Sequence, residues 1–284
     1  MKEMNNNVDN LLLLIQQLPQ DKGEVIKKYI SGKEKLILIM DHIPWNAGSN
    51  SGLANLLRFF TYPGYINLVG TESADNSVDT EWLANLSRND MTKEVVGSFV
   101  QNLRLSPGEY LSVLPDNHIT LWGIDDMEIY QKQMPLWIEA LPLVKHMRDT
   151  NGDFYSAPEN IRALMSAYNE FDRLDRQRAE KMVNNLLKKL GEHDEIYKLN
   201  AAVMICCGHL PEYAGEYLER INVSHVIIRP FSSSKDEFET YESLLNSQSN
   251  LKHDRLKPKK TIKRTPFSRF IILILSLWEK IRGK

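Results

Sequence analysis

Five short, almost wholly apolar runs, separated by longer amphipathic stretches, constrain the fold of this chain most strongly. They span residues 35–40 (KLILIM), 66–71, 119–124, 201–206 and 223–228. An apolar run of this length is typical of a strand that is buried on both faces of a sheet. Strands that alternate with helices predict an α/β fold with a mainly parallel sheet, flanked by helices and joined by right-handed crossovers.

The stretches between the runs have the apolar spacing of amphipathic helices. Residues 10–31 predict one or two helices broken near Pro19 and Gly23, and residues 41–52 predict a loop. Residues 126–190 are helical in pattern, with interruptions at Pro135, Pro142 and 151–158, and we expect them to form an insert lobe over one sheet edge. Further helices are predicted at 53–60, 79–86, 91–103 and 211–221.

These patterns predict four segments along the 284 residues. An N-terminal helical segment (1–34) precedes the α/β domain, which spans 35–231 and contains the helical insert of about 126–190. Residues 232–265 are polar, weakly patterned and increasingly basic, which is typical of a linker. Residues 266–284 predict a basic-apolar tail helix.

The tail carries a charge opposite to that of the rest of the chain. Residues 251–284 contain eleven Lys/Arg and two Asp/Glu, so their balance is +9, whereas the remaining 24 basic and 35 acidic residues give −11. A helix over Phe267–Ile281 is about 22 Å long at 1.5 Å per residue, too short to cross a bilayer. Its apolar residues predict burial against another surface: Phe270, Ile271, Ile274, Leu277 and Trp278.

The receptor for this tail stays open: it is an anionic membrane surface, a partner protein or a groove on the body of the same chain. Nucleic acid is not expected, because the basic run KPKKTIKR is short and has no interleaved aromatic residues. The chain shows no export signal, and its two cysteines, Cys206 and Cys207, are neighbours that cannot staple a fold. We therefore expect a cytoplasmic protein, with the inner face of the membrane as the place to which the tail would bind it.

Polar residues follow four of the predicted strands at the edge where parallel sheets bind ligands. His42 follows the first strand directly, Glu72 follows the second, Asp125 the third and His209 the fourth. Two histidines and a carboxylate can hold a divalent metal such as Mn, Co or Zn, whose bound water becomes a nucleophile. Alternatively, a glutamate orients a histidine that acts as general base on free water, without a metal.

These residues resemble the pattern of the superfamily that contains the TIKI/TraB proteases, ChaN and erythromycin esterase. Its members carry Gly-x-x-His after the first strand, a glutamate after the second and another Gly-x-x-His near the C-terminus, which correspond here to His42, Glu72 and His209. The stretches 78–126 and 206–230 are similar to an uncharacterised bacterial branch of this superfamily. Together with the residues around His42 and Glu72, the similarity spans roughly 35–230.

The resemblance implies that His42, Glu72 and His209 are catalytic residues or metal ligands in a peptidase-like or esterase-like hydrolase. It also implies a place for Glu109 near the site. Arg176, on the Arg-rich helix RQRAEKMVNNLLKKL, is a candidate for binding an anionic group together with Arg178 nearby. Asp125 is a candidate for substrate binding, although it also stands where a helix cap would.

Two departures from the pattern leave a second hypothesis open. The glycine three residues before each histidine is replaced by Ile39 and by Cys206, and a side chain there crowds a ligand that glycine would admit. The site is then either a working hydrolase site for an amide or ester bond, or a decayed site in a binding or assembly subunit that docks through its tail.

Overall fold

The computed structural model describes residues 7–32, 34–41, 47–78, 119–149, 158–197 and 199–231. The chain divides into two compact units. The first unit consists of Met1–Met127 and Arg176–Ser233, and the second consists of Glu128–Asp175 and Ser234–Lys284. The first unit contains the sheet. The predicted helices at 79–86 and 91–103, the linker and the tail Phe267–Ile281 lie outside the described residues.

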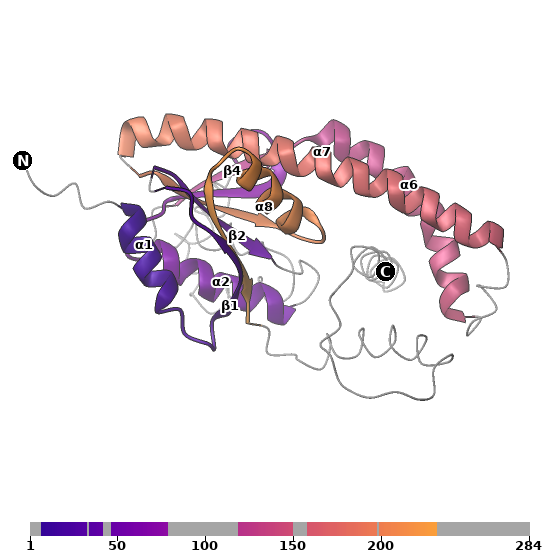
Figure 1. Cartoon of the computed structure of the whole chain (residues 1–284), viewed down its shortest axis with the longest axis horizontal. Coiled ribbons are helices and arrows are strands. Elements are labelled where there is room, and N and C mark those ends of the chain that lie inside the picture. The colour runs from indigo at the N-terminus through magenta and orange to yellow at the C-terminus, as the bar shows by residue number, and fades with distance from the viewer. Residues whose placement is uncertain are drawn as a thin grey trace, which may run out of the picture. The chain divides into compact units, whose positions relative to one another are not determined.

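A single six-stranded sheet in the order β1-β6-β2-β5-β3-β4 forms the centre of the first unit (Figure 1). Its strands are β1 (Gly23–Tyr29), β2 (Leu36–Asp41), β3 (Leu68–Ala74), β4 (Thr120–Asp125), β5 (Ala201–Cys206) and β6 (Ser224–Pro230). All neighbours from β6 to β4 pair in parallel, and only β1 is antiparallel to its neighbour β6. The predicted α/β fold is confirmed, and all five predicted strands lie within two or three residues of their expected bounds.

The first strand, β1, was not predicted. Residues 10–31 were expected to form one or two helices broken near Pro19 and Gly23. Only α1 (Asn7–Gln16) is a helix, and Gly23–Tyr29 instead pairs with β6 across about 200 residues of chain. The sequence GEVIKKY has no clear helical or alternating period, so the long-range pairing decides its conformation. A register shift between Val25 and Lys27 lets this edge strand bulge.

Helices cover both faces of the sheet, and the strands alternate their side chains between the two layers. On β2, Leu36, Leu38 and Met40 pack with α1 and with α2 (Ala47–Thr61). Residues 41–52 were predicted to be a loop, so α2 begins earlier in the chain than expected. Ile37 and Ile39 face the opposite way, toward α8 (Leu210–Arg220) and the second half of α7 (Pro158–Tyr197). Each face therefore has its own apolar cluster.

The described part of the second unit is helical. It contains α6 (Met127–Asp149) and the first half of α7, and α6 continues through Pro135 and Pro142, where interruptions were predicted. The Gln133 amide donates a buried hydrogen bond of 2.6 Å to Asp175. Within the described residues, no helix has the length and apolarity needed to cross a bilayer.

Two helical glycines provide a matched test of the packing on either side of the sheet. A Cβ on Gly52 in α2 would lie 2.0 Å from the carbonyl oxygen of Phe231, whereas none of the described atoms outside the helix backbone lies within 4 Å of a Cβ on Gly191 in α7. We expect Gly52→Ala to lower the free energy of unfolding by about 1–3 kcal/mol through this clash. Gly191→Ala should raise it by up to about 1 kcal/mol through helix propensity.

Urea denaturation of both variants measures these differences. A Gly52→Ala variant at least as stable as the unsubstituted protein would contradict the close approach of α2 to the end of β6.

Candidate functional site

The parallel strands bring their carboxyl ends to one edge of the sheet, as the sequence predicted. β2 ends at Asp41, β3 carries Glu72 near its end, β4 ends at Asp125 and β5 ends just before Cys207. Polar side chains from four strands thus gather where a ligand of an open parallel sheet binds.

A bulge at the end of β3 sets the position of Glu72. Thr71 pairs with Gly123, but the next pair joins Ala74 to Asp125, so β3 contains one more residue than β4 over this interval. The bulge fits because Gly123 has no side chain: a Cβ there would lie 1.9 Å from the carbonyl oxygen of Ala74. Bulges commonly redirect a side chain next to a functional site.

Arg178 on α7 binds the two carboxylates of this edge together. Its Nε donates to Asp125 Oδ1 at 2.7 Å, and its Nη2 donates both to Asp125 Oδ2 and, at 2.9 Å, to Glu72 Oε2. The side chains of Arg178 and Asp125 are 6% and 2% exposed, whereas that of Glu72 is 22% exposed. Glu72 is therefore the member of the cluster that solvent or a ligand can reach.

The electrostatics of the cluster favour a carboxyl group that exchanges protons. Burial raises the pKa of Glu72 above its usual value, and the negative charge of Asp125 acts in the same direction. The positive charge of Arg178 and hydrogen bonds from Cys207 oppose this increase only in part. A carboxyl group with a raised pKa is better matched to acid–base work near neutral pH than an ordinary glutamate.

Cys207 lies against Glu72 but is not suited to act as a nucleophile. Its thiol is hydrogen-bonded to Glu72, and burial followed by the charge of Glu72 raises the pKa of Cys207 well above its usual value. The neighbouring Cys206 is fully buried, and burial raises the pKa of its thiol as well. Both thiols stay protonated, so they act as small packing groups and, for Cys207, as a donor to Glu72.

Asp41 is held by Arg229 of the neighbouring strand β6. The guanidinium of Arg229 donates two hydrogen bonds to Asp41 Oδ2, at 2.6 and 3.1 Å. This pair fixes the residue that directly precedes His42, so the chain leaves β2 from a firmly held position.

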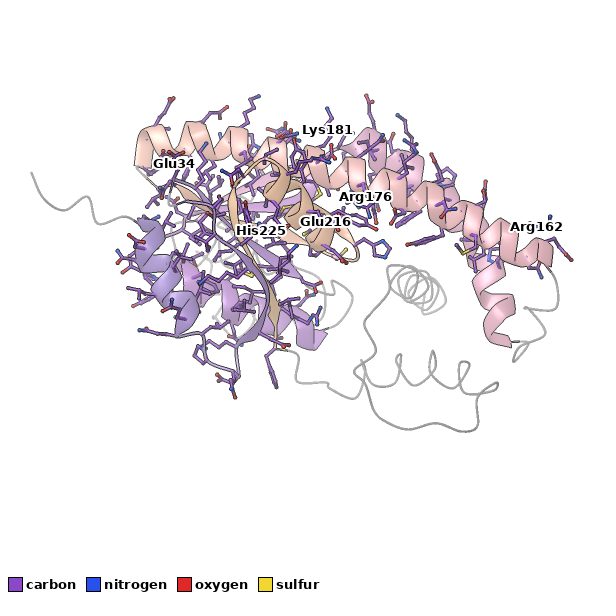
Figure 2. The ribbon with its side chains drawn as sticks, viewed as in Figure 1. Glu34, Arg162, Arg176, Lys181, Glu216 and His225 are labelled. Carbon is purple, nitrogen blue, oxygen red and sulfur yellow. The ribbon has the colours of Figure 1, made fainter. Side chains whose placement is uncertain are left out.

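His209 is 2% exposed and stands at the N-terminal end of α8. Its ring centroid lies 5.7 Å from that of Tyr213, and the Arg176 guanidinium lies over the Tyr213 ring at 4.0 Å from the centroid of that ring. Figure 2 shows Arg176 beside Glu216, with which it forms an ion pair of 2.9 Å. The predicted anion-binding residue Arg176 is thus on the surface and neutralised, and Arg178 occupies the buried position instead.

His42 and Glu109 lie outside the described residues, so the convergence of His42 with Glu72 and His209 stays a prediction. Among the described residues, no group of three or more His, Cys, Asp or Glu side chains is arranged to hold a metal ion. The described part of the site also does not fit a dication, because the Arg178 guanidinium binds both carboxylates and would repel a second cation.

The sequence placed Arg178 beside Arg176 as a candidate for binding an anionic group, although a signal for its burial is present. It lies four residues before Met182 and eight before Leu186, on the apolar stripe of α7 that packs on the sheet. A charged residue on such a stripe indicates a buried ion pair. Its partners lie 53 and 106 residues away, and the sequence offers no means of naming them.

Comparisons with protein-family models, with curated proteins and with solved structures find no match to this chain. The resemblance to the TIKI/TraB, ChaN and erythromycin esterase superfamily therefore stays a prediction.

The buried cluster predicts a large difference between two arginine substitutions. Arg178→Ala leaves Asp125 and Glu72 close together without their cation, and should lower the free energy of unfolding by about 3–5 kcal/mol. Arg173→Ala removes an exposed pair with Glu170 on the same helix and should change the stability little, because solvent screens the pair. Chemical denaturation measures both, and equal effects would contradict the structural role of Arg178.

The raised pKa of Glu72 predicts a pH dependence of stability. The folded state holds this proton more tightly than the unfolded state, so the contribution of Glu72 is full below its ordinary pKa of 4.5 and is lost as pH rises through its folded pKa. Glu72→Gln removes this loss. The variant should gain stability relative to the unsubstituted protein as pH increases above 4.5, measured by denaturation across pH. A difference that shrinks with pH would contradict the burial argument.

Proposed function

We propose that the chain is a metal-independent hydrolase of an amide or ester bond, with Glu72 as its proton-transfer group and with His42 and His209 as its partners. One observation carries the proposal: Glu72 is the partly exposed end of a buried ion cluster at the ligand-binding edge of the sheet, and its pKa is raised.

In the proposed reaction, the Glu72 carboxylate takes a proton from a water molecule. The water oxygen forms a bond to the substrate carbonyl carbon and gives a tetrahedral intermediate. The proton then passes to the leaving oxygen or nitrogen as its bond to carbon breaks, which regenerates the carboxylate. Arg178 fixes one oxygen of Glu72 and positions it without touching the substrate.

A metal-dependent reaction at His42, Glu72 and His209, with Mn, Co or Zn, is the competing form of the same proposal. The positive charge of Arg178 next to Glu72 favours the metal-free form.

The second candidate function is a non-catalytic binding or assembly subunit on the same fold. Two observations favour it: Arg178 neutralises the carboxylates as a purely structural cluster would, and His209 is almost fully buried against Tyr213. In this form the chain docks to the inner membrane face or to a larger complex through Phe267–Ile281, whose basic-apolar sequence is suited to such a surface.

The experiment that tests the proposal measures hydrolysis of nitrophenyl esters and peptide nitroanilides by the full-length protein. We expect Glu72→Gln to lower kcat/KM at least about 100-fold, the usual contribution of a general base, while the protein stays folded. Glu170→Gln, an exposed glutamate paired with Arg173, is the matched control and should retain full activity. Activity should rise with pH as Glu72 loses its proton, above pH 4.5, and should survive treatment with a chelator.

Equal activity of the two glutamate variants would overturn the role of Glu72. If a chelator abolishes the activity and Mn, Co or Zn restores it, the metal-dependent reaction becomes the better account than the metal-free one. If no substrate is cleaved and the protein instead pellets with anionic vesicles, the assembly subunit becomes the better account.

A further inference from the structure

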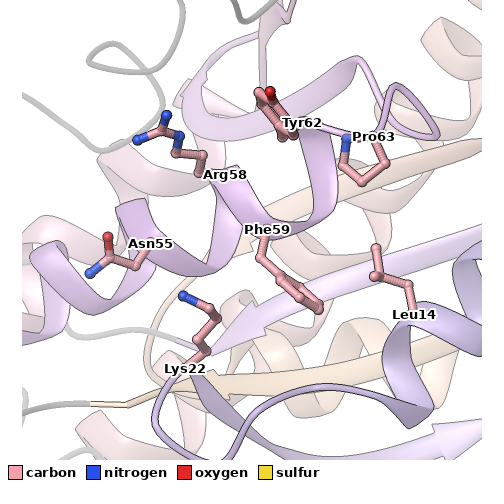
Figure 3. Close-up of a pocket in the computed structure, with 7 residues that line it drawn as sticks. All are labelled: Leu14, Lys22, Asn55, Arg58, Phe59, Tyr62 and Pro63. Atoms are coloured by element: carbon pink, nitrogen blue, oxygen red, sulfur yellow. The ribbon is translucent and has the colours of Figure 1, made fainter.

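A groove on the α1 and α2 layer of the sheet combines an apolar wall with two cations (Figure 3). It is formed by α1, by the turn before β1 and by the second half of α2, and shares no residue with the Glu72 cluster. Its volume of about 450 Å³ lies within the range of about 300–1,000 Å³ that is usual for sites of small ligands.

One side of the groove is apolar. Leu14 and Phe59 are half-buried and pack against the core of this layer, while Tyr62 is 67% exposed and Pro63 follows it. Because the inner side chains are anchored in the core and the outer one is open to solvent, this wall is available to an apolar ligand chain without a rearrangement of the fold.

The other side of the groove is polar and positively charged. In Figure 3, Asn55, Arg58 and Lys22 lie on the side away from Leu14 and Pro63, with the Arg58 side chain above the ribbon of α2 and Lys22 below it. Asn55, Arg58 and Tyr62 are spaced by three and four residues, which places them on one face of α2 and its C-terminal end.

These cations differ from those at the sheet edge because, among the described residues, no carboxylate pairs with them. No residue lining the groove is acidic, and no ion pair within the described part of the chain involves Lys22 or Arg58. Lys22 is half-buried and Arg58 is exposed, so both cations can be reached by a ligand from solvent.

We propose that this groove binds a single-chain amphiphilic anion. The anionic head group lies between Lys22 and Arg58, with the Asn55 amide as a further donor, and the apolar chain lies along Phe59 toward Leu14 and Pro63. The segregation of charge and apolar surface to opposite sides specifies this class, because a small polar anion leaves the apolar wall wet and a neutral chain leaves the cations without a partner.

The tail of the same chain is excluded as the occupant by its charge. Residues 251–284 carry a balance of +9, and a segment of that sign is repelled by a groove whose described lining residues include two cations and no acidic side chain. The proposal is also independent of hydrolysis at Glu72, since it involves other residues on another face.

Isothermal titration calorimetry of the full-length protein with decanoate, below its micelle concentration, tests the proposal. Decanol and decyltrimethylammonium carry the same chain without the negative charge, and acetate carries the charge without the chain. We expect saturable binding of decanoate at one site per chain. Decanol and decyltrimethylammonium should bind at least about tenfold more weakly, because a hydrogen bond to a charged group is worth about that factor. Acetate should also bind at least about tenfold more weakly, because it buries none of the apolar wall.

Variants then locate the site. Lys22→Met and Arg58→Met should each weaken decanoate binding about tenfold, because each removes one charged donor. Tyr62→Ser should weaken it severalfold by shortening the apolar wall. Lys28→Met, on the exposed surface of β1 and outside the groove, is the matched control and should bind as the unsubstituted protein does. Thermal unfolding of each variant shows that the fold is retained.

Three results would overturn the proposal. Equal binding of acetate and decanoate would mean that the groove recognises charge alone. Unchanged decanoate binding in Lys22→Met and Arg58→Met would place the ligand elsewhere. Association only with vesicles of anionic phospholipid, and not with dissolved decanoate, would make this face a membrane-contact surface rather than a site for a single amphiphile.

Discussion

The contact between Arg178 and the two carboxylates is the interaction on which the ligand-binding edge of the sheet depends. A guanidinium that is 6% exposed is costly to remove from water, and only a set of well-aligned acceptors offsets that cost. The acceptors come from β3 and β4, and the donor comes from α7, so the ion cluster fixes the helix against both strands. The bulge in β3 and the absence of a side chain at Gly123 are the local conditions that allow it.

The sequence predicted the sheet well because its central strands are buried on both faces. Such strands consist of apolar runs that hardly any other element of the same length produces, and β2 and β5 are the clearest cases. The edge strand β1 escaped prediction because it is exposed over most of its length and owes its conformation to β6, far along the chain. Prediction failed for β1 because a sequence pattern reports on neighbouring residues, whereas the contact that stabilises β1 is made with a distant strand.

The site divides in the same way. Parallel strands must end at a common edge, so polar residues that follow them were expected to gather there; of these residues, Glu72 and Asp125 are joined through Arg178. The partner that binds both could not be deduced, because Arg178 stands on a helix whose alignment with the sheet is set by packing. Arg176, two residues earlier, faces a different direction on the same helix and forms an exposed pair with Glu216. Two residues along a helix correspond to a rotation of about 200°, which separates a buried position from a surface one.

Whether a cation is already neutralised also decides what each region of this fold offers to a ligand. At the sheet edge, Arg178 and Arg229 are both bound by carboxylates, which is why we propose a role there for the carboxyl group of Glu72 rather than for a cation. On the α1 and α2 layer, the described residues that line the groove include Lys22 and Arg58 and no acidic residue, which is why we propose that the groove binds an amphiphilic anion. The two proposals thus differ because of the position of acidic residues rather than the number of basic ones.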